Sequence, residues 1–122
     1  SITIPSTVTS IGDDAFYSCN NLRSVYITDL AAWCSIRFDN HSSNPLWCKA
    51  DLYIDDIIVT SVDISSDITS IGESAFNGCT NLETAVIGNG IESIESKTFF
   101  NCKSLKNITL YDGLKTIKTN RL

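Results

Sequence analysis

The residues in this sequence that could do chemistry are five cysteines and one histidine. Cys34, His41 and Cys48 are evenly spaced, and a thiol beside an imidazole can form a nucleophilic pair or bind a metal ion. Structural zinc sites, however, usually take four ligands with closer cysteine pairs, and no third cysteine is close in sequence. We therefore expect no catalytic residue, no metal ion and no cofactor. We expect His41 to be a surface residue.

The cysteines have simpler explanations. Cys19, Cys79 and Cys102 occupy one position of a repeated pattern, where a free cysteine behaves as a small buried hydrophobic residue. Cys34 and Cys48 could form a disulfide or remain reduced packing residues, and the sequence leaves both alternatives open. The odd number of cysteines does not identify the redox compartment.

The pattern that must position these residues has a period of 23. Phe76 recurs as Phe99 at this offset, and Phe16 precedes Phe76 by 60. A fixed period of about 20–29 residues with apolar anchors indicates a leucine-rich-repeat solenoid. We expect a mostly β, single leucine-rich-repeat domain over residues 1–122, as a segment of a longer array.

Each coil is predicted to contain two extended pieces and one tight turn. Residues 1–11 alternate apolar and polar, which indicates a strand, and Pro5 begins a bend within them. In residues 13–22 the anchors Phe16, Cys19 and Leu22 lie three apart, which fits a short 3₁₀ or single helical turn. We expect parallel strands on one face, second short strands elsewhere and a buried ladder of phenylalanines. The second apolar pairs follow each bend: Val8 and Ile11, Ile68 and Ile71, Ile91 and Ile94, and Leu114 and Ile117 after the bend at 111–113.

One coil is enlarged, at about residues 28–61. Asp29 precedes a short apolar run and is predicted to cap a helix that begins at Leu30. Residues 35–38 alternate as a brief strand, and residues 39–44 form a polar loop that Pro45 closes.

The end of the enlarged coil indicates a β-hairpin. Two apolar runs in residues 52–59 flank Asp55-Asp56, which is a two-residue turn, although a weaker turn signal than Asn-Gly. Trp33 and Trp47 are expected to pack this elaboration onto the solenoid. An exposed tryptophan that anchors a ligand is the alternative.

The repeated motif resembles that of the BspA-like (Treponema pallidum-type) leucine-rich repeat family. The motif runs Val8-Thr-Ser-Ile11-Gly12-x-x-Ala15-Phe16-x-x-Cys19-x-x-Leu22-x-x-Val25-x-Ile27. The enlarged coil also resembles an element found in these proteins. Departures from the motif are local; for example, Thr98 replaces the alanine at the position of Ala15. The resemblance implies a secreted or surface-attached bacterial protein, with adhesion to host or matrix proteins in some members.

Composition narrows the choice of partner. A net charge of −5 and a pI near 4.6 argue against nucleic acid or an anionic membrane surface, which attract basic patches. No stretch approaches the roughly 18 apolar residues of a membrane span. We expect a non-catalytic module that binds a protein, of host or extracellular-matrix type, or a glycan. The alternative is a structural spacer that extends another domain from the cell surface.

The outward positions of the predicted strands are the candidate binding face. The constant repeat offset aligns them in one strip, which a solenoid can use as an extended binding surface. Nothing like a polar capping repeat follows Ile117, so self-association through an open repeat end is also expected. The face comprises Thr3, Tyr26, Asp63, Val86 and Thr109, flanked by Ser24, Thr84 and Asn107.

Overall fold

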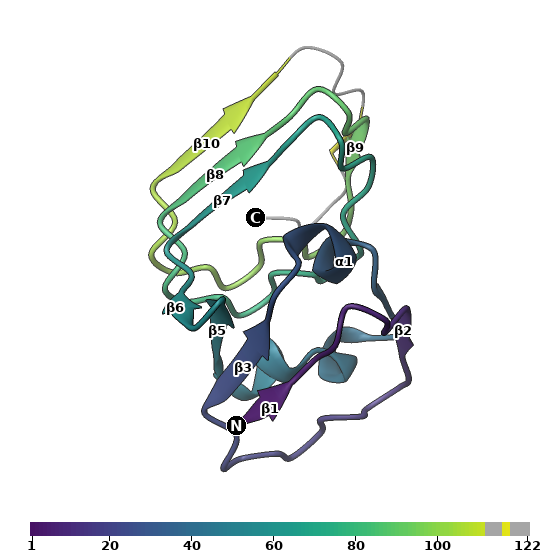
Figure 1. Ribbon diagram of the computed structural model, residues 1–122, viewed down its shortest axis with the longest axis vertical. Coiled ribbons are helices and arrows are strands. Elements are labelled where there is room, and N and C mark those ends of the chain that lie inside the picture. Colours follow the sequence, from purple (N-terminus) through teal and green to yellow (C-terminus); the bar gives the residue numbers. More distant parts are fainter. Residues whose placement is uncertain (112–115, 118–122) are drawn as a thin grey trace.

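The computed structural model describes residues 1–111 and 116–117 of the chain, and its regular elements are mostly short strands (Figure 1). The predicted bend at 112–113 and the predicted apolar position Leu114 lie outside these described residues. Four strands form one sheet in the order β1 (Ile2–Thr3), β3 (Ser24–Ile27), β5 (Asp51–Ile54) and β6 (Ile57–Ile58). A second sheet has the order β10 (Asn107–Leu110), β8 (Thr84–Ile87) and β7 (Ser61–Ile64).

The remaining elements are also short. Two strand pairs form between β2 (Ser10–Ile11) and β4 (Arg37–Phe38), and between β9 (Ser93–Ile94) and β11 (Thr116–Ile117). One α-helix, α1 (Leu30–Cys34), and two 3₁₀ helices, η1 (His41–Ser43) and η2 (Pro45–Cys48), lie between β3 and β5. The described residues thus show the expected mostly β fold with few helices.

The second sheet repeats the sequence period. Asp63 pairs with Val86, and Val86 pairs with Thr109, so adjacent parallel strands are offset by one full period of the sequence (Figure 1). Ala85 and Ile87 of β8 are buried, while Val86 between them is half-buried, because successive side chains of a strand point to opposite faces. Paired residues on adjacent strands of this sheet are therefore one repeat period apart in the sequence.

The phenylalanine ladder is shorter than predicted. Phe76 and Phe99 are fully buried and stack with ring centroids 5.7 Å apart and planes within 5°. Phe16, by contrast, is half-buried and only packs against the edge of the core. The ladder stops because the enlarged segment, with the buried Trp33 and Leu46, lies beside the first repeat in place of another phenylalanine.

The predicted helix and hairpin of the enlarged segment are both confirmed. The Asp29 side chain accepts a hydrogen bond from the Ala32 amide at 3.2 Å and caps α1. Strands β5 and β6 are antiparallel, and Asp55 and Asp56 between them have φ of 50° and 66°. Positive φ at both turn residues is the conformation that a two-residue hairpin turn requires.

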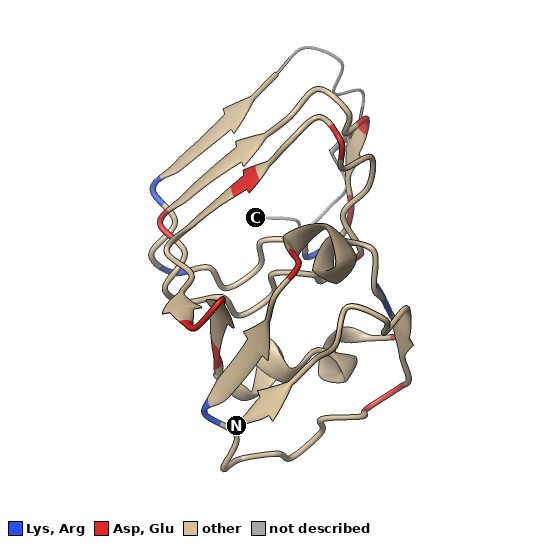
Figure 2. Ribbon diagram, viewed as in Figure 1, with Lys and Arg blue, Asp and Glu red and all other residues tan. Residues whose placement is uncertain are grey.

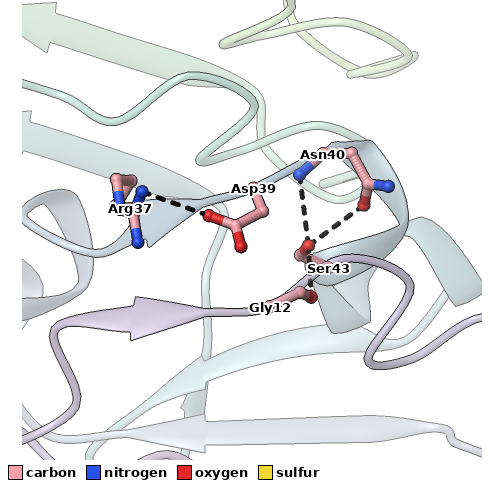
Figure 3. A network of polar contacts seen from close by, with 5 residues as sticks. All are labelled: Gly12, Arg37, Asp39, Asn40 and Ser43. Carbon is pink, nitrogen blue, oxygen red and sulfur yellow. Dashed lines mark hydrogen bonds and ion pairs between the residues drawn. The ribbon is translucent and has the colours of Figure 1, made fainter.

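The polar segment predicted as a loop at residues 39–44 contains the 3₁₀ helix η1 and is largely buried. Ser42, Ser43 and Asn44 are buried in η1 and at the start of η2. Figure 3 shows how Ser43 connects this segment to the first repeat: its hydroxyl donates to the Gly12 carbonyl at 2.6 Å and accepts from the Asn40 amide at 3.2 Å. Burial of the Ser43 and Asn44 side chains costs little because both hydrogen-bond the neighbouring backbone.

Asn44 makes the corresponding connection to the next repeat. Its Nδ2 donates to the carbonyls of Ser74 at 2.8 Å and Ala75 at 3.0 Å, while its Oδ1 accepts from the Leu46 amide at 2.9 Å. The indole Nε1 of Trp33 also donates to the Ala75 carbonyl, at 3.0 Å. Side chains of the enlarged segment thus supply donors to the backbone of the repeat that follows.

Regular repeats make the corresponding connection chiefly with backbone amides. The Gly78 amide, for example, donates to the Phe100 carbonyl of the following repeat at 2.8 Å. The side chains of Asn44 and Trp33 therefore replace donors that the 3₁₀ helices of the enlarged segment do not supply.

The two tryptophans have different environments. Trp33 is 1% exposed, so its predicted packing role is confirmed. Trp47 is 38% exposed, and its predicted burial is wrong. The reason is local: Pro45 and Leu46 turn one side of η2 into the core, which leaves Trp47 on the outer side.

The tight turns use left-handed backbone that the sequence does not reveal. Positive φ recurs at two fixed positions of the repeat, and only one of these residues is glycine. The first position comprises Asp14, Ser74 and Lys97, and the second comprises Ser18, Gly78 and Asn101. Gly72 is required for another reason, since a Cβ there would collide with the Ile36 carbonyl.

Candidate functional site

The predicted binding face is divided between the two sheets. In the first sheet Thr3 lies beside Tyr26, and in the second Asp63, Val86 and Thr109 are aligned as predicted. The predicted adjacency of Tyr26 and Asp63 is wrong. β5 pairs with β3, and the hairpin strand β6 occupies the outer edge of β5, so β7 begins a separate sheet.

Tyr53 takes the position beside Tyr26 that the repeat offset predicts for Asp63. The two tyrosine rings stack with centroids 4.8 Å apart and an interplanar angle of 26°. Both side chains are half-buried, so the stack has one accessible side. Tyr53 escaped prediction because the offset between β3 and β5 is longer than the repeat period. A signal was nevertheless present, since Asp51-Leu-Tyr-Ile has the same pattern as Ser24-Val-Tyr-Ile.

The flanking positions place polar groups around both parts of the face. Ser24 pairs with Asp51, whose carboxylate accepts a hydrogen bond from Asn81 Nδ2 at 2.6 Å. Thr84 is half-buried and Asn107 is exposed in the second sheet. Figure 2 shows one acidic segment on β7, which contains Asp63, and no other charge on β7, β8 or β10. The face therefore presents aromatic, hydroxyl and amide groups with few charges.

Four of the cysteines are in settings typical of packing residues. All five are free thiols, so Cys34 and Cys48 do not form a disulfide. Burial raises the pKa of Cys34, Cys79 and Cys102 to about 12, and it also raises the pKa of Cys48. A thiol with a raised pKa stays protonated at neutral pH and reacts slowly, because the thiolate is the nucleophile.

Two of these thiols donate equivalent hydrogen bonds to the carbonyl of a repeat phenylalanine. Cys102 Sγ donates to the Phe76 carbonyl at 3.1 Å, and Cys48 Sγ donates to the Phe16 carbonyl at 2.8 Å. Cys48 is therefore the cysteine of the enlarged repeat that corresponds to Cys102, a relationship that the irregular spacing conceals. In both cases the thiol satisfies a carbonyl of the preceding turn.

His41 has a different setting from the expected surface histidine. Its ring is half-buried and meets the Trp47 ring edge-on, with centroids 4.4 Å apart. Among residues 1–111 and 116–117, no three histidine, cysteine or acidic side chains are placed to hold a metal ion. No helix in this part of the chain is long and apolar enough to cross a membrane.

Comparison with known proteins gives one match. The model of the BspA type leucine rich repeat region matches residues 1–43 and 51–122 in six copies. The matched ranges include β1, β3, β5, β7, β8 and β10, and the gap falls on η2 and the residues beside it. No curated protein and no solved structure matches the chain.

Proposed function

Because the chain belongs to the BspA-type leucine-rich repeat family, we propose that it is a non-catalytic protein-binding module of a bacterial cell-surface or secreted protein. Leucine-rich repeats generally mediate protein interactions, and this family is commonly surface-associated. We propose that residues 1–122 form one domain of a solenoid and that its strand face contacts the partner. The partner would be a host or extracellular-matrix protein, or a glycan displayed on one.

The stacked pair of Tyr26 and Tyr53 is the observation on which this proposal rests. Their rings lie 4.8 Å apart, and packing against each other restricts the freedom that either would lose on binding. Tyrosine is a frequent energetic anchor of interfaces, because it combines apolar area with a hydroxyl group. Beneath the pair, Val25 and Leu52 are buried and hold the strands in place.

The second sheet supplies a smaller surface of the same kind. Asp63 and Thr109 are exposed on either side of the half-buried Val86. An apolar centre with polar neighbours is the usual arrangement of a protein interface. We propose that Ser24, Thr84 and Asn107 contribute contacts around the two parts of the face.

The test is binding of purified extracellular-matrix and mucosal proteins, measured by surface plasmon resonance with the chain immobilised. Tyr26→Ala combined with Tyr53→Ala should weaken binding at least tenfold, and Tyr26→Ala combined with Asp63→Ala should weaken it less. Both variants should retain the melting temperature of the parent to within a few degrees. Tyr17→Ala is the matched control, since Tyr17 is 66% exposed but lies in a turn outside the sheets.

The outcomes separate the two proposed functions. Unchanged affinity in both double variants, with binding lost when residues 39–49 are altered, would move the site to the enlarged repeat. If no variant affects binding, the spacer function is favoured, and the regular pairing of β7, β8 and β10 supports that alternative.

Self-association is a further proposed contact. Leu110 and Tyr111 are 45% and 52% exposed at and beside β10, which is the outer strand of its sheet among the described residues. Sedimentation of the parent chain and of Leu110→Asp over a range of concentrations tests it. Identical monomeric behaviour of both chains would refute it.

A further inference from the structure

A cleft lies beside the exposed tryptophan, at the starts of β3 and β5. Its volume is about 490 Å³, which is within the range of roughly 300–1,000 Å³ for small-molecule sites. Arg23 immediately precedes β3, and Lys49 lies shortly before β5. The residues that line the cleft are Ser18, Asn20, Arg23, Trp47, Cys48 and Lys49.

Trp47 is held with its ring at the surface. The preceding Leu46 is fully buried, and the Leu46 carbonyl accepts a hydrogen bond from the Lys49 amide at 3.0 Å, so the backbone of η2 is fixed on both sides of Trp47. His41 packs edge-on against the indole, with ring centroids 4.4 Å apart. A large aromatic ring that is 38% exposed and fixed in place costs little entropy to stack against a ligand.

The cleft is basic, whereas the chain is acidic. Arg23 and Lys49 are the charged residues of its lining, and no acidic side chain lines it. In the described part of the chain, neither cation forms an ion pair with a carboxylate. The guanidinium of Arg23 is also oriented, because its Nη1 donates to the Asn20 carbonyl at 2.7 Å. A net charge of −5 repels a long polyanion, so the local field suits a small ligand with one or two anionic groups.

We propose that this cleft binds an acidic saccharide. The apolar face of a pyranose ring stacks on Trp47, and its carboxylate or sulfate group pairs with Arg23 and Lys49. Asn20 and Ser18 offer an amide and a hydroxyl to the sugar hydroxyls. Cys48 forms part of the wall, and its thiol is already engaged with the Phe16 carbonyl. This site is separate from the proposed strand face and does not depend on it.

The intrinsic fluorescence of the chain provides the assay. The chain has two tryptophans, and Trp33 is 1% exposed, so a change on adding ligand reports on Trp47. The probes are sialyllactose, which has a carboxylate, a chondroitin sulfate disaccharide, and lactose as the neutral control. We expect saturable quenching by at least one acidic probe and at least tenfold weaker binding of lactose. The two acidic probes distinguish a carboxylate from a sulfate as the recognised group.

Variants test the assignment of residues. Arg23→Gln should weaken binding of the acidic probe about tenfold, as expected for one charge-assisted hydrogen bond. Arg37→Gln is the matched control and should have no effect, because Arg37 does not line the cleft. Its side chain is 75% exposed and forms an ion pair with Asp39 at 3.5 Å. For Trp47→Ala, ligand-observed NMR replaces fluorescence and should show no saturable binding, with the thermal transition of the fold retained.

Three results would overturn the proposal. The first is the absence of saturable quenching by both acidic probes at millimolar concentrations. The second is equal affinity for lactose and the acidic probes, and the third is an equal loss in Arg23→Gln and Arg37→Gln. None of these bears on the strand face, which is tested with matrix proteins and the tyrosine variants.

Discussion

Replacing Asn44 should be among the most destabilising changes to a polar residue in this chain. Asn44 is fully buried and forms three hydrogen bonds, two as donor to the carbonyls of Ser74 and Ala75 and one as acceptor from the Leu46 amide. Each is worth about 0.5–1.5 kcal/mol, and a buried amide left without a partner costs about 1–3 kcal/mol more. Both carbonyls keep another donor, from Asn77 and Trp33, whereas the described residues offer no other partner to the Leu46 amide. Asn44→Ala should therefore lower the free energy of unfolding by about 3–5 kcal/mol.

Urea denaturation followed by circular dichroism measures this loss, with an unchanged slope showing that the same surface is exposed. Asn40→Ala is the matched control. Asn40 is half-buried, and its side chain bonds Asp14 near the surface, where water can replace it. It also accepts from the Ser43 hydroxyl, which keeps the Gly12 carbonyl as an acceptor, so the loss should be about 1 kcal/mol. Asn44→Asp should cost at least as much as Asn44→Ala at neutral pH, because a carboxylate would face two carbonyl oxygens. Its deficit relative to the parent should shrink in acid, where the protonated carboxyl can donate. Equal losses in Asn44→Ala and Asn40→Ala would refute the bridging role of Asn44.

Three other predictions concern the core and the thiols. Phe76→Ala should cost roughly 3–5 kcal/mol and the half-buried Phe100→Ala much less, and equal losses in a urea titration would contradict the repeat register. Gly72→Ala should cost roughly 1–3 kcal/mol through its backbone collision, whereas Gly12→Ala at the same repeat position makes only an ordinary contact with Asp39 and should be near neutral in a thermal melt. The three thiols with a pKa of about 12 stay protonated when folded but titrate from 9.0 when unfolded. Their contribution to stability is complete below pH 9.0 and falls as pH rises toward 12, by up to about 1.4 kcal/mol per pH unit for each thiol. The free energy of unfolding, measured from pH 8 to 11, should fall less steeply with pH in Cys79→Ala than in the parent chain. An equal slope in the two chains would contradict the burial argument.

The regular part of the fold could be predicted because its signal is periodic. The interval from Phe76 to Phe99 in the sequence equals the interval between the paired strands β7 and β8. The hairpin was also readable, since two apolar runs flank Asp55-Asp56. These features depend on local spacing, which a sequence shows directly.

The enlarged repeat could be predicted only in part, because burial there depends on contacts between distant segments. Asn44 follows two serines and has the composition of a surface loop, but its partners at Ser74 and Ala75 are far away in the sequence. Trp33 and Trp47 are the same residue type, and only the orientation of η2 decides which of them is exposed. For the same reason the predicted alignment of Thr3 with Tyr26 and of Asp63 with Val86 and Thr109 is confirmed, whereas the alignment across β5 and β6, which separate the sheets, is wrong.

The constant register of β7, β8 and β10 also bears on how such a chain can change in length. A tandem duplication of one whole period within this block would give each new strand the same partners as its neighbours, and each new phenylalanine a ring to stack on. Such an insertion would preserve every contact on either side. The junction at Asn44 and Trp33 behaves differently, because its donors are specific side chains that an ordinary repeat lacks. Expansion and contraction by whole periods are therefore compatible with the block that begins at β7, whereas a regular repeat in place of the enlarged one would lack the side-chain donors of Asn44 and Trp33.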